Sequence, residues 1–182
     1  MTTTGPNNPG TEAQTSSGKP TWSNMGNVAA SDNAYATAQP LGNSFATETM
    51  SVTNFGFSVS GTVAGITVEV ERKSTTASST TCKDSIVQLV KDGSTGVGTN
   101  KAAAGNWPSS DAYATYGSAS DLWGTTWTAA EINSSNFGVN FAAIGDTGVG
   151  QPVGSVDHIR ITVETTTGAT FVARRALMGV GF

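Results

Sequence analysis

Hydrophobic and polar residues alternate along several short stretches of this chain, which is the pattern of β-strands with one buried face. The clearest stretch is 66–72, where Ile66, Val68 and Val70 share one face and polar residues occupy most of the other. Residues 85–91 are apolar on both faces in the middle, which favours a strand inside a sheet. Alternation also predicts strands in the ranges 33–38, 52–59, 113–116, 137–141, 157–163 and 171–177.

Turn and helix signals separate these stretches. Asp92-Gly93 is a hairpin-turn signal, and a glycine-rich loop spans 145–154. Thr128 and Glu131 have the spacing of a capping box, which predicts one short helix, because the Asn and Ser residues at 133–136 compete with helix. Short strands divided by such turns predict an all-β protein, an antiparallel β-sandwich with a jelly-roll-like arrangement.

The chain divides into three regions. Residues 1–21 have almost no apolar side chains, so we expect an extended N-terminal arm, either disordered or lying on a neighbouring surface. Residues 22–165 form the predicted sandwich, and 166–182 supply a C-terminal strand and an apolar tail that packs in the core or at a subunit contact. The candidate interface residues are therefore Pro6, Pro9, Pro20, Trp22, Arg174, Arg175, Met178 and Phe182.

Charge is scarce, and this excludes some classes of partner. Only 12% of the 182 residues are charged and the net charge is −4, so we expect no nucleic acid partner, which would require a basic face. No stretch approaches the ~18 apolar residues of a membrane span, and the first residues lack the features of a signal peptide, so we expect no membrane partner. The single cysteine, Cys82, excludes an internal disulfide and a cysteine-based zinc site.

Candidate catalytic residues are few. His158 is the only histidine, and its neighbour Asp157 belongs to the opposite face of a predicted strand, so the two form no direct dyad. Glu69 and Glu71 share a strand face, as a glycosidase pair would, but any half-exposed strand produces the same spacing. We predict no enzyme, no catalytic residue, no metal site and no cofactor.

The tryptophans are a separate candidate surface. Trp107, Trp123 and Trp127 lie in turn-rich regions, where exposed rings on a β-sandwich can stack on sugars. Partial burial with a bonded indole N–H is the commoner fate of such residues, and sugar stacking is the alternative. These three tryptophans are the possible surface aromatics, with a host glycan as their ligand.

Several segments resemble a β-sandwich module found in structural proteins of tailed bacteriophages. The most specific part comprises WPSSDAYATYG at 107–117, DLWGTTWT at 121–128 and INSSNFGV at 132–139. The pattern also includes NAYAT at 33–37, FGFSV at 55–59, ITVEVERK at 66–73, DSIVQLVK at 84–91 and, at its end, SVDHIRITV at 155–163. The resemblance covers about residues 22–165 and transfers no catalytic residue.

The resemblance implies a structural role in the virion. Because the module accounts for most of the sequence, we expect a capsid decoration or cement protein that binds and stabilises the head surface. Its expected partners are the major capsid protein or other virion proteins, and we also expect a homo-oligomer. A tail, neck or fibre component, or a carbohydrate-binding adhesion module, is the alternative.

Overall fold

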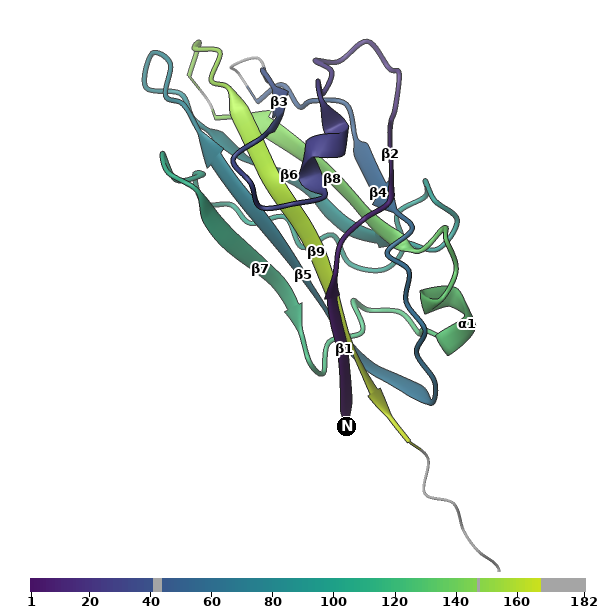
Figure 1. The fold of residues 1–182 in the computed structure, drawn as a ribbon. Coiled ribbons are helices and arrows are strands. Elements are labelled where there is room, and N and C mark those ends of the chain that lie inside the picture. Colours follow the sequence, from purple (N-terminus) through teal and green to yellow (C-terminus); the bar gives the residue numbers. More distant parts are fainter. Residues whose placement is uncertain (41–43, 147, 168–182) are drawn as a thin grey trace, which may run out of the picture.

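The sandwich expected from the alternation is confirmed: two antiparallel sheets pack against each other (Figure 1). This computed structural model describes residues 1–40, 44–146 and 148–167. The five-stranded sheet contains β1 (Thr2–Asn7), β3 (Ala36–Ala38), β5 (Thr62–Ser74), β7 (Ala112–Ser118) and β9 (Gly154–Thr166). The four-stranded sheet contains β2 (Thr11–Gln14), β4 (Met50–Thr53), β6 (Cys82–Val90) and β8 (Gly138–Gly145). The short helices are η1 (Met25–Val28) and α1 (Ala129–Ile132).

The strand order agrees with a jelly-roll-like arrangement once segment 96–101 is included. The sheets have the orders β1-β9-β5-β7, with β3 also beside β9, and β2-β4-β8-β6. Val97 donates its backbone N–H to the Leu89 carbonyl, and Lys101 to the Val87 carbonyl, both at 2.8 Å. Segment 96–101 therefore covers the outer edge of β6. With this segment counted, β6 lies inside its sheet, as expected for 85–91, although it is the last of the named strands in the order.

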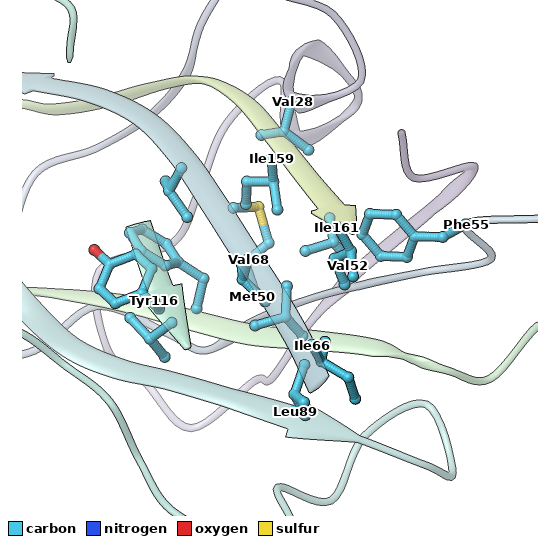
Figure 2. Close-up of a cluster of buried hydrophobic side chains, with 14 of the residues drawn as sticks. Val28, Met50, Val52, Phe55, Ile66, Val68, Leu89, Tyr116, Ile159 and Ile161 are labelled. Atoms are coloured by element: carbon cyan, nitrogen blue, oxygen red, sulfur yellow. The ribbon is translucent and has the colours of Figure 1, made fainter. Parts of the chain in front are cut away.

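The core lies between the two sheets, and its residues follow the alternation of β5 and β9. Ile66 pairs with Val163 and Val68 with Ile161, and all four side chains are buried. Removing such a side chain from water contributes about 1.5–3 kcal/mol to folding. Figure 2 shows Ile66, Val68 and Ile161 beside residues of the other sheet, among them Met50, Val52 and Leu89.

The strand expected at 52–59 is shorter than the alternation suggests, since β4 ends at Thr53. Asn54 and Gly56 have φ values of 59° and 66°, in the left-handed region that regular strands do not use. Phe55 and Phe57 are nevertheless buried on alternate positions. The alternation of buried and exposed residues at 55–59 therefore comes from a segment that faces the core but is not part of a strand.

The short helix forms as its cap predicts. Glu131 donates its backbone N–H to Thr128 Oγ1 at 3.2 Å, and Thr128 donates its own to Glu131 Oε2 at 2.8 Å. The helix ends after one turn, where the Asn133 side chain bonds the backbone N–H and carbonyl of Val59. The local side-chain competition that the sequence indicated is seen just after it, where Asn136 donates its backbone N–H to Ser134 Oγ at 3.1 Å.

The N-terminal arm is extended, as expected, but it is not separate from the sandwich. Thr2 lies opposite Thr165 of β9, so β1 extends the five-stranded sheet. Thr11 lies opposite Thr53 of β4, so β2 extends the other sheet. Pro9 is buried where the chain passes between the two sheets. A boundary at residue 21 is therefore wrong, since residues 2–14 provide a strand to each sheet.

Candidate functional site

Polar side chains gather on the outer face of the five-stranded sheet. The outer-face cluster consists of Glu69 and Glu71 of β5, Tyr113 of β7, and His158 and Arg160 of β9. The strand register places Glu71 between Tyr113 and His158, and Glu69 beside Arg160. The carboxylates and the histidine singled out in the sequence therefore lie in one place.

Hydrogen bonds connect nearly every member of the outer-face cluster. Arg160 donates from Nε and Nη2 to the two oxygens of Glu69 at 2.9 and 3.0 Å, a bidentate pair. Its guanidinium carbon also lies 4.3 Å from the centre of the Tyr113 ring. The Tyr113 hydroxyl lies 2.9 Å from His158 Nδ1, and His158 Nε2 lies 2.9 Å from Asn8 Oδ1. The histidine thus joins β7 to the N-terminal segment.

His158 is a buried residue. Its exposed fraction is only 6%. Burial lowers the pKa of His158, and the nearby Arg160 guanidinium lowers it further. A neutral ring fits its contacts, with Nδ1 accepting from Tyr113 and Nε2 donating to Asn8. Both ring nitrogens therefore have partners, and Arg160 pairs with Glu69, so these contacts hold β5, β7, β9 and the N-terminal segment together.

Asp157, next to this histidine, serves a different segment. Its carboxylate accepts the backbone N–H groups of Asp32 and Asn33 at 3.4 and 3.2 Å. Burial raises the pKa of Asp157, and the two backbone bonds oppose this rise. The residue therefore holds the loop before β3 against the sheet, which agrees with the expectation that it forms no dyad with His158.

A second polar group, which was not predicted from the sequence, lies inside the sandwich. Arg72 Nε lies 3.2 Å from Asp84 Oδ1, and both side chains are buried. Asp84 also accepts from Trp107 Nε1 and the Tyr116 hydroxyl, each at 2.7 Å, and from the Ala103 N–H at 3.0 Å. We call these five residues the buried ion-pair cluster. It connects β5, β6 and β7 with the segment before β7.

A third group fixes the turn after β2. The buried carboxylate of Glu48 accepts from Thr15 Oγ1, from the Lys19 N–H at 2.9 Å and from Ser17 Oγ at 2.9 Å. These bonds, with that from Thr15 the largest contribution, lower the pKa of Glu48 to about 2. Trp22 donates its indole N–H to the backbone carbonyl of the same glutamate at 2.9 Å. Glu48 therefore holds residues 15–22 against the four-stranded sheet.

We expect the hydrogen bonds of the Glu48 carboxylate to make the stability of the fold depend on pH in the acidic range. A carboxyl with a lower pKa in the folded chain stabilises the fold above its unfolded pKa and loses that effect as pH falls through the folded value. The contribution of Glu48 is therefore complete above about pH 4.5 and is lost as the pH falls to about 2. Glu48→Gln should melt about 5 °C below the unmodified chain at pH 7, and thermal melts should show the gap closing across this range.

Glu12 provides the control of opposite sign. Burial raises the pKa of Glu12, so its contribution is present at low pH and is lost as pH rises. Glu12→Gln should therefore melt no lower than the unmodified chain above pH 4.5, and any gap that opens as pH rises should have the opposite sign to that of Glu48→Gln. A Glu48→Gln gap that stays constant from pH 7 to pH 2 would contradict the role given to the Glu48 carboxylate.

The tryptophans are not surface aromatics, and this expectation is corrected. The exposed fractions of Trp107, Trp123 and Trp127 are 3%, 0% and 6%. Each side chain lies inside with its indole N–H bonded to an acceptor there, which is the commoner fate of such residues. The acceptors are Asp84 Oδ1, the Ile66 carbonyl and the Leu122 carbonyl, respectively. None of the three rings offers an open face for a sugar.

The candidate interface residues separate into three groups. Trp22 and Pro9 are buried within the chain, so their assignment to an interface is wrong. Pro6 is exposed in β1, and Pro20 is half-buried with its carbonyl accepting the Glu48 N–H. Arg174, Arg175, Met178 and Phe182 lie outside the described residues, as does the strand expected at 171–177.

The described ranges contain no pocket and no group of three or more side chains arranged to hold a metal ion. In the same ranges, no helix is long and apolar enough to cross a membrane. No protein-family model, no curated protein and no solved structure matches this chain.

Proposed function

We propose that this chain is a structural protein of a tailed-bacteriophage particle, a decoration protein that binds the head surface and stabilises the shell. The proposal starts from the resemblance over residues 22–165 to a module of phage structural proteins. The clusters of polar residues described above are consistent with it, because their hydrogen bonds join segments of this chain to one another.

The observation that carries the proposal concerns the two ends of the sequence. Residues 2–14 serve as strands of both sheets, so we do not assign the anchor to them. Residues 168–182 follow β9 in the sequence, and the last residues of β9 pair with the first residues of the chain, since Thr165 lies opposite Thr2. They carry two arginines and no acidic residue in a chain of net charge −4, and they are mostly apolar. We assign attachment to the head to this segment.

Truncation at residue 167 tests the assignment. Chain 1–167 should bind purified heads that lack the protein at least about tenfold more weakly than chain 1–182 in a sedimentation assay. Its melting temperature should stay close to that of the full chain. The double variant Arg174→Ala, Arg175→Ala should also weaken binding, whereas Lys19→Ala, which removes an exposed charge elsewhere, should not. Equal binding by chains 1–167 and 1–182 would contradict this anchor.

A tail, neck or fibre component is the alternative location. A protein at that location could have the same module and the same segment 168–182, but it would be present in fewer copies per particle. The adhesion alternative has lost its candidate residues, because the three tryptophans that would stack on sugars are buried.

A further inference from the structure

One edge of the sandwich differs from the others. In the described part of the chain, β7 pairs only with β5, and Figure 1 shows it along one margin of its sheet. Its sequence, AYATYGS, contains no charged residue and no proline. Ala112, Tyr113, Thr115 and Ser118 are exposed, and Tyr113 reaches 36%. An open, uncharged edge strand is a template for pairing with another strand.

The other edges carry features that oppose such pairing. Strand β1 contains Pro6 and an irregular register between Thr4 and Asn7. Segment 96–101 covers β6. Strand β2 has only four residues and includes Glu12. Proline, irregular register, covering segments and charge are the usual means of protecting an edge, and β7 has none of them before Gly117, whose φ is 76°.

We propose that β7 pairs antiparallel with β7 of a second copy of this chain, around a twofold axis at Thr115. Residue 115 is the centre of the strand, so this register pairs all seven residues. It places Tyr113 opposite Gly117 of the second copy and Ala114 opposite Tyr116 of the second copy. Each aromatic ring thus meets a small residue, and an aromatic side chain across from a strand glycine is a favourable pair. No like charges meet along the strand.

The pairing joins the two five-stranded sheets into one continuous sheet in a symmetric dimer. Strand pairing of this length buries a small interface, so we expect association to depend on protein concentration. The inference goes beyond attachment to the head and does not rest on it, because self-association is measured on the purified chain alone.

A cysteine at the axis provides the direct test. Residues directly opposite each other in antiparallel strands have Cα atoms about 4.5–5.5 Å apart, within disulfide range. Thr115→Cys should therefore form an interchain disulfide under mild oxidation. Ser118→Cys is the matched control, because the two copies of residue 118 lie about 20 Å apart along the paired strands. The natural Cys82 is buried, and burial raises its thiol pKa to about 11, so it should not contribute.

Charge at the axis provides the second test. Thr115→Lys and Thr115→Glu should each associate about tenfold more weakly than the unmodified chain in sedimentation velocity, and an equimolar mixture should recover association. Thermal melts check that each variant folds. Cross-linking of Thr115→Cys no faster than that of Ser118→Cys, or undiminished association of Thr115→Lys, would overturn the proposal. Cross-linking at position 115 that disappears in chain 1–167 would overturn it too, because segment 168–182 would then be the element required for pairing.

Discussion

Asp84→Ala is expected to lower the free energy of unfolding by about 3–5 kcal/mol, because it leaves Arg72 as a buried charge without its partner. The same change removes the acceptor of Trp107 Nε1 and of the Tyr116 hydroxyl. For a domain of this size the melting temperature should fall by about 10 °C. Urea denaturation followed by tryptophan fluorescence measures the loss.

The neighbouring residue supplies the control for this variant. Lys83 forms an ion pair with Asp146 at 2.8 Å, but its side chain is 30% exposed. Lys83→Met should therefore cost less than about 1 kcal/mol, as exposed pairs do. Equal losses at positions 83 and 84 would show that burial of the ion pair is not what makes it important.

Removing residues 1–14 should destabilise the fold more than any of these single substitutions. The deletion takes away β1 and β2, so β9 and β4 each lose a strand partner. It also removes Asn8, which accepts from His158. Because domains are stable by only about 5–15 kcal/mol, chain 15–182 should lack a cooperative unfolding transition at 25 °C, as measured by circular dichroism.

A peptide of residues 1–14 should restore the transition when it is added to chain 15–182. Strand addition supplies main-chain hydrogen bonds to both exposed edges, so recovery should increase with peptide concentration. A scrambled peptide is the control. A chain 15–182 that melts like the full chain would contradict the finding that the arm belongs to the sandwich.

The sequence predicted the sandwich well because its central strands follow a strict period of two. It contained a signal for the buried ion-pair cluster as well. Arg72 is in phase with Ile66, Val68 and Val70, so it extends their core-facing row. A charge on that row requires a buried partner. The partner, Asp84, could not be identified, because the pairing depends on how two different sheets face each other.

The N-terminal strands could not be predicted, for a different reason. Strands at a sheet edge are held largely by backbone hydrogen bonds, which every residue type except proline can make. Residues 2–14 are polar and mostly exposed, so their side chains show no apolar alternation. The burial of the tryptophans could not be predicted either. Their turn-rich flanks indicate a surface position, but buried acceptors such as the Ile66 carbonyl bond the indole N–H groups inside the protein.

The copy number of this chain in purified phage particles tests the proposed function most directly. A decoration protein occupies every equivalent position of a symmetric shell. Quantitative mass spectrometry, with the major capsid protein as the reference, should therefore find hundreds of copies per particle. Deletion of the gene should remove these copies and make the heads less stable. A few copies, or a few dozen, would assign the chain to the tail, neck or fibres. Its absence from the particle would contradict a structural role in the virion.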